Sequence, residues 1–262
     1  MDLGISGRTA IVMGGSRGLG LSCAKLLASE GVNVVIGARA KEPLTKAKEQ
    51  IGKIGSVMSI SADIHKVNDR TRIIKQALKA FGAVDILIVN TPGGVAGFKS
   101  VIETTKKDWN QAIKCKFNSA IEMCQAVLPE MLERKWGRII NLSTITALEP
   151  LEDFSLSNAT RLACLGYFRT LALETAKNGV IVNSILVGHT DTTALKKYLN
   201  QIAVRKKITV AAVERGIIDQ TPIRRHLLPE ETAALVTFLC SELASGMIGQ
   251  TLRLDGGFSR TL

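Results

Sequence analysis

The chain has few aromatic residues, scattered cysteines and no long apolar run. Aromatic side chains make up 4% of the 262 residues, so the sequence offers no series of rings on which nucleic-acid bases could stack. The five cysteines are odd in number and include no Cys-x-x-Cys pair. This pattern indicates free thiols in a reducing compartment and predicts neither a zinc site nor a disulfide framework. No apolar run approaches the roughly 18 residues of a membrane span.

The first residues also lack a basic segment followed by an apolar stretch, so we expect no secretory signal and predict a cytoplasmic protein without a membrane partner. The 34 Lys and Arg exceed the 23 Asp and Glu and give a net charge of +11. That charge suits a nucleic acid or phosphate-rich ligands, or a basic protein with charges spread over its helix exteriors. The densest basic run is only residues 205–207. It favours the second interpretation and argues against a nucleic-acid partner.

Short β-branched runs alternate with longer helical patterns, and this alternation predicts a single α/β domain with a parallel sheet. The strand candidates are Thr9–Met13, Asn33–Ala38, Val57–Ser61, Asp85–Val89, Gly137–Leu142, Val180–Leu186 and Thr251–Leu254. The helix candidates are Gly18–Ser29, Pro43–Ile54, Val67–Phe81, Thr105–Lys135, Phe154–Lys177 and Glu230–Ser241. Most strand candidates are nearly continuous apolar runs, as expected when helices cover both faces of the sheet. No internal repeat or low-complexity linker divides the chain.

Residues 189–228 break this rhythm with many charges and an irregular apolar pattern. They follow the sixth strand candidate, and domains of this class bind ligands at the carboxyl ends of their strands. We interpret the segment as a mobile cover over a substrate site. A surface loop without function is the alternative.

A glycine-rich turn follows the first strand candidate and opens the first helix candidate. Gly14, Gly18 and Gly20 are spaced as Gly-x-x-x-Gly-x-Gly. Glycines allow a tight turn and a close backbone approach to a pyrophosphate, which the amides at the helix start can receive. In this strand-turn-helix context the pattern predicts a dinucleotide site.

The end of the second strand candidate indicates which dinucleotide is bound. An acidic residue there would hydrogen-bond the ribose 2′-hydroxyl of NAD and repel a 2′-phosphate. The chain has Arg39 instead, and Arg17 offers a second guanidinium group to such a phosphate. We therefore predict NADP(H) as the cofactor. Two solvated surface arginines are the alternative.

The chain resembles the short-chain dehydrogenase/reductase family over nearly its full length. Beyond the glycines, the similar motifs are Ala62-Asp63-Ile64, Val89-Asn90-Thr91-Pro92-Gly93, Trp109, Leu128–Met131, Gly137–Asn141, Gly179–Asn183 and Gly249–Gly257. The resemblance implies a single-domain, doubly wound Rossmann fold with a seven-stranded parallel sheet, a small carbonyl/alcohol substrate, and a homo-oligomer, either dimer or tetramer. With the turn, the resemblance predicts these cofactor contacts: Gly14, Ser16, Arg17, Gly18, Leu19, Gly20, Arg39, Asp63, Ile64, Asn90, Gly188 and Thr190.

Reductases of this family use an Asn, a Ser and a Tyr-x-x-x-Lys pair, and the chain departs from all four. Counted from the motifs, the Asn position falls on Lys116 and the Ser position on Thr144. The Tyr and Lys positions fall on Ser157 and Arg161. A shifted pair does not explain the difference, because neither tyrosine of the chain is followed by a lysine four residues later. The chain is similar to a divergent branch that lacks the pair.

These replacements keep the helical spacing but change the chemistry. An aliphatic hydroxyl at Ser157 is a far weaker acid than a phenol. Arg161 stays protonated, so it can hold a ribose and supply positive potential but cannot relay a proton. Thr144 retains a hydroxyl for a substrate carbonyl. Lys116 introduces a cation that could replace the acid if burial lowers its pKa; a solvent-facing lysine is the alternative.

Four further residues near these positions are weighed more briefly. His189 could serve as an acid near neutral pH, although an exposed loop histidine is the favoured interpretation. Glu152 and Asp153 precede the helix of Ser157 and are interpreted as N-terminal caps. Tyr167 is interpreted as a packing or interface residue.

Three functions stay open. The favoured one is an NADP(H)-dependent oxidoreductase that acts on a carbonyl/alcohol pair by a modified proton route. The second is a cofactor-binding protein with little or no turnover, a redox sensor or structural subunit, because all four catalytic residue types are replaced. Nucleic-acid binding through the +11 charge is the least supported.

Overall fold

The computed structural model describes residues 1–91 and 99–260. Within these ranges, seven strands form one parallel sheet in the order β3-β2-β1-β4-β5-β6-β7. They are β1 Thr9–Met13, β2 Asn33–Ala38, β3 Val57–Ser61, β4 Ile86–Asn90, β5 Gly137–Thr144, β6 Val180–Val187 and β7 Thr251–Leu254. The strand order reverses between β1 and β4, which pair directly. The predicted doubly wound fold is therefore confirmed, and such a reversal opens a crevice at the carboxyl ends of the strands.

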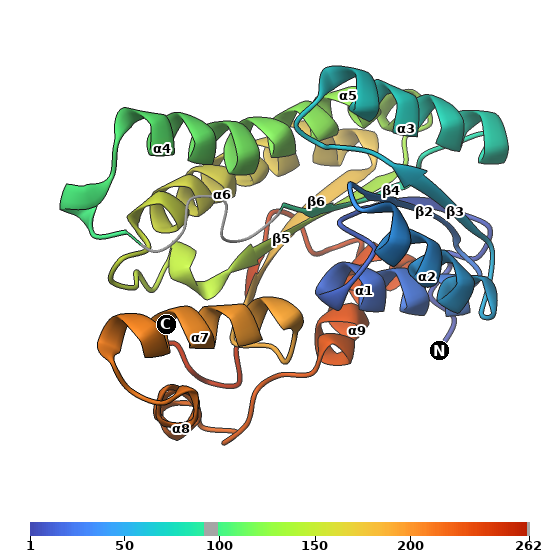
Figure 1. Ribbon diagram of the computed structural model, residues 1–262. Helices are drawn as coiled ribbons and strands as arrows, with labels where there is room; N and C mark the ends of the chain where they lie inside the picture. The colour runs from blue at the N-terminus through green and yellow to red at the C-terminus, as the bar shows by residue number, and fades with distance from the viewer. Residues whose placement is uncertain (92–98, 261–262) are drawn as a thin grey trace.

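Helices cover both faces of the sheet (Figure 1). They are α1 Gly18–Ser29, α2 Lys41–Gly52, α3 Val67–Phe81, α4 Lys106–Ala112, α5 Ser119–Glu133, α6 Ser155–Thr175, α7 Thr193–Lys206, α8 Val210–Gln220 and α9 Pro229–Cys240. One layer contains α3, α4, α5 and α6, and the other contains α1, α2 and α9 (Figure 1). Helices α7 and α8 form a separate pair beside the second layer (Figure 1).

Each helical layer encloses its own apolar core against the sheet. Alternate residues of β1 show the division: Ala10 and Val12 belong to one buried cluster, and Ile11 and Met13 belong to the other. Successive side chains of a strand point to opposite faces. Both faces therefore require apolar residues, which explains the continuous apolar runs of the strand candidates.

The helical stretch predicted for residues 105–135 is confirmed over residues 106–133, but its middle is π-helical. Helix α4 ends at Ala112, a π-helical segment spans Ile113–Asn118, and α5 begins at Ser119. The Ser119 hydroxyl donates to the carbonyl oxygen of Cys115 over 2.7 Å, so a side chain takes part in the hydrogen bonding of this segment. Apolar periodicity does not reveal such a local change, and π-helical turns often occur at functional sites.

Residues 189–228 form a helical pair in place of an irregular loop. Helices α7 and α8 enclose a small apolar cluster of their own, whose buried members are Leu195, Leu199, Ala203, Val213 and Ile217. Thr192 caps α7 and Thr209 caps α8, each through a side-chain oxygen that accepts a backbone N–H. Two short helices joined by a turn explain why no single apolar period ran through this segment.

The interpretation of Glu152 and Asp153 as helix caps is wrong. The residue at the N-cap of α6 is Phe154, and no side chain caps the helix there. Asp153 has a φ of 62° and pairs with Arg205 over 3.0 Å. Its carboxylate therefore connects the start of α6 to the end of α7.

The five cysteines are all buried and unpaired by disulfides, as free thiols were predicted. Within the described ranges, no helix combines the length and apolar character needed to cross a bilayer.

Candidate functional site

A cavity of about 770 Å³ lies at the carboxyl ends of the strands on both sides of the β1–β4 reversal. Its walls come from the turn after β1, the ends of β2, β4, β5 and β6, the π-helical segment, and the first turns of α6 and α7. Its volume is within the usual range of small-molecule and cofactor sites. All predicted site residues except Gly20 line this cavity.

The turn after β1 has the backbone geometry that a phosphate group needs. Gly14 and Gly18 have φ values of 69° and 52°, a region that favours glycine. Arg17, the N-cap of α1, is extended and makes no side-chain cap, so no capping side chain competes for the amides of the first turn. A helix N-terminus of this kind binds anions, and the turn therefore fits a pyrophosphate.

Gly20 does not line the cavity itself, and its contact with the cofactor stays a prediction. A Cβ at this position would lie 2.4 Å from the Gly14 carbonyl oxygen and 2.9 Å from Nδ2 of Asn90. The missing side chain lets α1 pack closely against the turn and the end of β4. Gly20 thus shapes the cavity without lining it.

The outer end of the cavity is cationic. Arg17 and Arg39 both line it and are both exposed, and neither has an ion pair within the part of the chain that the structure describes. His65, which sequence reasoning missed, also lines this end. Burial lowers its pKa and Asp63 opposes the shift, while Arg39 lowers it further. The positive charge at this end therefore comes from Arg17 and Arg39, the two residues predicted to bind a 2′-phosphate.

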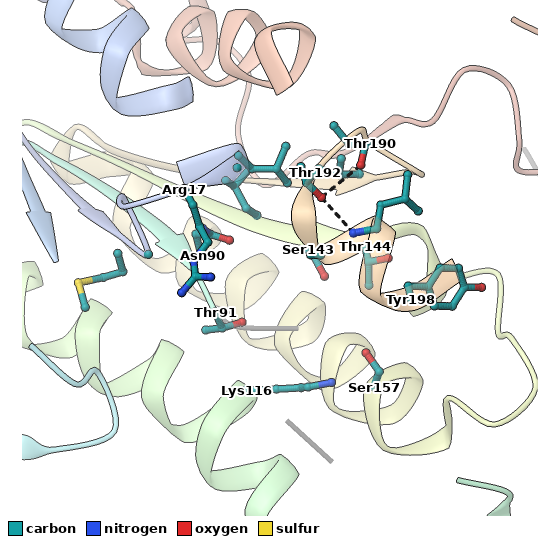
Figure 2. A pocket seen from close by; sticks show the side chains of 18 of the residues that line it. Arg17, Asn90, Thr91, Lys116, Ser143, Thr144, Ser157, Thr190, Thr192 and Tyr198 are labelled. Carbon is teal, nitrogen blue, oxygen red and sulfur yellow. Dashed lines mark hydrogen bonds between the residues drawn. The ribbon is translucent and has the colours of Figure 1, made fainter. Parts of the chain in front are cut away.

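Other predicted cofactor contacts are held by hydrogen bonds within their own loops. Oδ1 of Asp63 accepts from the His65 backbone N–H over 3.1 Å. The Thr190 hydroxyl donates to the carbonyl oxygen of Gly188 over 3.2 Å, and Thr192 in turn donates to Thr190 (Figure 2). A Cβ at Gly188 would lie 2.7 Å from the Cα of Asp255, so the glycine allows the loop after β6 to pass close to residue 255.

Lys116 lies on the π-helical segment at the inner end of the cavity. Its side chain is 3% exposed, and its amine points toward the Ser157 hydroxyl (Figure 2). The amine has no hydrogen bond or ion pair among the described residues. Burial, followed by the positive charge of Arg161, lowers the pKa of Lys116 to about 7. The solvent-facing alternative for this lysine is therefore wrong.

Arg161 is buried on α6 and directs its guanidinium to the ends of two strands. It donates to the Thr91 hydroxyl over 2.6 Å, to the Thr91 carbonyl oxygen over 3.1 Å, and to the Leu142 carbonyl oxygen over 3.4 Å. Nε of Arg161 is buried without a partner. The arginine therefore joins the ends of β4 and β5 and keeps a positive charge next to Lys116.

Three hydroxyl groups surround the inner end. Ser157 is half-buried on the first turns of α6, and Thr144 ends β5. The Thr144 hydroxyl accepts from the Thr146 N–H over 3.5 Å. Ser143, which sequence reasoning missed, also lines the cavity, and its buried hydroxyl has no partner. The buried β5 extends two residues beyond its predicted end, which brings both hydroxyls into the site.

His189 is not the exposed loop histidine that was favoured. Its ring stacks on Tyr198 with centroids 5.9 Å apart and contacts the edge of Phe258 at 5.0 Å. Burial lowers the pKa of His189 to about 4, so the imidazole is neutral near pH 7. The ring forms part of the cavity wall, and as a neutral imidazole it cannot act as the acid at that pH.

Neither tyrosine places its phenol hydroxyl beside Ser157 and Thr144 at the inner end. Tyr167 packs against the core and against Phe168, as interpreted from the sequence. Tyr198 lines the cavity from α7, but its hydroxyl points away from Ser157 and Thr144 (Figure 2), and burial raises its pKa to about 12. Pro92 and Gly93, part of the motif after β4, lie outside the described residues.

Comparison with known proteins gives a consistent result over nearly the whole chain. A family model described as Enoyl-(Acyl carrier protein) reductase matches residues 14–259. Dehydrogenase/reductase SDR family member 4 of Oryctolagus cuniculus is 31% identical over 254 residues, which cover 97% of this chain and 94% of that protein. D-beta-hydroxybutyrate dehydrogenase of Cupriavidus necator is 30% identical over 256 residues, which cover 97% and 98%. L-sorbose reductase from Gluconobacter frateurii, solved with NADPH and L-sorbose, is similar at a TM-score of 0.92 and 30% identity over 100% of both chains.

Proposed function

The chain belongs to the short-chain dehydrogenase/reductase family, and on that premise we propose that it is an NADP(H)-dependent oxidoreductase in which Lys116 is the proton donor. The reaction interconverts a carbonyl group and an alcohol. One observation carries the proposal: a buried lysine with a pKa near 7 points at the Ser157 hydroxyl. An acid with a pKa near the working pH is suited to proton transfer.

The preference for NADP(H) is supported by charge at the outer end. Arg17 and Arg39 are exposed at the cavity wall, and no acidic residue follows β2 directly. Guanidinium groups form strong hydrogen bonds to phosphate. The similar L-sorbose reductase was solved with NADPH, which agrees with this assignment.

The proposed proton route uses three side chains. Ser157 and Thr144 donate hydrogen bonds to the carbonyl oxygen of the substrate and orient it. The bound dinucleotide supplies a hydride to the carbonyl carbon. Lys116 gives one proton to the oxygen, which completes the alcohol and leaves a neutral amine that solvent reprotonates. Burial, and after it the positive charge of Arg161, keeps the pKa of that amine low.

Helices α7 and α8 are proposed to cover the substrate. Residues of α7 line the cavity, including Leu195, Lys197 and Tyr198, and the pair has its own small core. We also propose a homo-oligomer, supported by the exposure of Leu162 and Leu173 on α6 at 52% and 62%; the molecular mass in solution tests it.

The variant Lys116→Met tests the proton donor. Loss of a positioned general acid is expected to reduce the rate of NADPH-dependent carbonyl reduction by about 10²–10⁴-fold, while NADPH affinity stays within roughly threefold of wild type. Lys107→Met, an exposed lysine of α4, is the matched control and should retain the wild-type rate. Equal turnover of wild type and Lys116→Met across a carbonyl panel would remove Lys116 from the mechanism.

A cofactor-binding sensor or structural subunit is the second candidate. It is favoured by the commitment of Arg161 to Thr91 and Leu142, because these bonds stabilise strand ends whether or not a reaction occurs. Tight NADPH binding without oxidation across the carbonyl panel would favour this candidate over the enzyme.

A further inference from the structure

The inner end of the cavity has positive groups without a negative counterpart. Lys116 and Arg161 are 3% and 6% exposed and both line the cavity. Among the described residues, Asp63 is the one carboxylate in the lining, and it follows β3 at the outer end. Below pH 7, where Lys116 is protonated, two buried cations therefore lie next to each other with no acidic side chain among the described residues beside them.

The two cations differ in how their donors are used. Three hydrogen bonds of Arg161 go to Thr91 and Leu142. The Lys116 ammonium has three N–H donors and no partner among the residues that the structure describes. Burying a charge is costly unless it is paired and hydrogen-bonded. A bound anion would supply both an opposite charge and a hydrogen-bond acceptor. An anionic ligand is therefore expected to bind most favourably at Lys116.

Apolar residues of the same cavity limit the rest of such a ligand. Leu151, Phe154 and Tyr198 line the cavity, and the rings of Phe154 and Tyr198 meet edge to face at 5.5 Å. The hydroxyls of Ser157 and Thr144 lie at the same inner end as the ammonium (Figure 2). A carbonyl held by the hydroxyls and an anion held by the ammonium must therefore be close together within one molecule.

We propose that the substrate is a 2-oxo acid, or in reverse a 2-hydroxy acid, with an apolar side chain, and that Lys116 binds its carboxylate. This inference rests on the proposed function for the redox step. The ammonium uses one N–H for the carboxylate and another for the neighbouring carbonyl oxygen. The apolar side chain lies against Leu151, Phe154 and Tyr198.

Benzoylformate and its neutral amide, benzoylformamide, test this assignment. Calorimetric titration is carried out on the protein with NADP⁺, so that no hydride is available and only binding is measured. Because a hydrogen bond to a charged group contributes about 1.5–3 kcal/mol, wild type is expected to bind the acid at least roughly tenfold more tightly than the amide. Lys116→Met should bind the two compounds within about twofold, and Lys107→Met should retain the wild-type preference. Thermal unfolding of each variant confirms that it is folded.

Each outcome of the test has a distinct meaning. Equal binding of acid and amide by wild type, binding of neither, or a preference that persists in Lys116→Met would overturn the inference. NADPH oxidation is then measured with both compounds. Equal reduction of both would overturn the inference but support the proposed oxidoreductase. Lys116-dependent binding of the acid without reduction of either compound would support the anion site and contradict the proposed reaction.

Discussion

The two ends of the cavity are constructed from different parts of the polypeptide. At the outer end, backbone geometry forms the site: Gly14 and Gly18 adopt positive φ values and α1 starts without a side-chain cap. At the inner end, side chains from distant segments form it, with Lys116 on the π-helical segment, Ser157 on α6 and Thr144 on β5. A positive φ at Gly14 and Gly18 favours glycine at those positions. Side chains at the inner end can change type while the backbone that carries them keeps its conformation. The predicted replacement of four catalytic residue types beside a retained glycine turn agrees with this difference.

The pH dependence of reduction tests the inner end most directly. With a pKa of about 7, Lys116 is protonated below that pH and loses its proton above it. The kcat/KM for carbonyl reduction, which reports the free enzyme, should be constant below pH 7 and should fall about hundredfold by pH 9, as the protonated fraction falls. Steady-state rates with NADPH give the profile. A constant kcat/KM up to pH 9 would contradict the assignment of Lys116.

The outer end is tested by a pair of glycine substitutions. In Gly20→Ala, the new Cβ would lie 2.4 Å from the Gly14 carbonyl oxygen, so we expect destabilisation by about 1–3 kcal/mol, as for overpacking, together with weaker NADPH binding. Gly216→Ala is the matched control on α8, where no atom lies within 4 Å of the added Cβ. It should raise stability by up to about 1 kcal/mol through helix propensity. Urea unfolding measures both, and equal effects would contradict the packing role of Gly20.

Stability as a function of pH distinguishes a buried lysine from an exposed one. The pKa of Lys116 falls from 10.5 to about 7 on folding, so between these values the unfolded chain binds a proton that the folded chain does not. The unfolding free energy of wild type relative to Lys116→Met should therefore rise with pH in this window, by about 1.4 kcal/mol per unit. Below pH 7 both states are protonated and the difference stays constant. Urea unfolding at three pH values measures the slope, and a zero slope would place the amine in solvent.

Arg39→Ala is expected to have the smallest effect, because the guanidinium is exposed and screened. The affinity for NADPH should fall roughly five- to tenfold through loss of a charge-assisted hydrogen bond, while the affinity for NADH should stay unchanged. Fluorescence titration of both dinucleotides checks this, with Lys41→Ala as an exposed control on α2. Equal affinity of wild type for the two dinucleotides would contradict the preference for NADP(H).

Local patterns predicted the fold, and together with the family resemblance they predicted site residues that all line the cavity except Gly20. Apolar runs located the strands because both faces of the sheet are covered, and the spacing of Gly14, Gly18 and Gly20 located the first turn. Two features escaped these patterns. The π-helical segment Ile113–Asn118 does not differ from α-helix in its apolar period, and the burial of His189 depends on Tyr198 and Phe258, which come from other elements.

Residue types and their order were sufficient to establish the strand-turn-helix start, the placement of Arg39, and the absence of a tyrosine followed by lysine four positions later. These properties are local, because backbone sterics and side-chain chemistry act at the residue itself. The proton affinity of Lys116 is not local. Its pKa near 7 depends on exclusion of water and on the nearby charge of Arg161, a residue of a different helix, and such proximity exists only after the chain has folded.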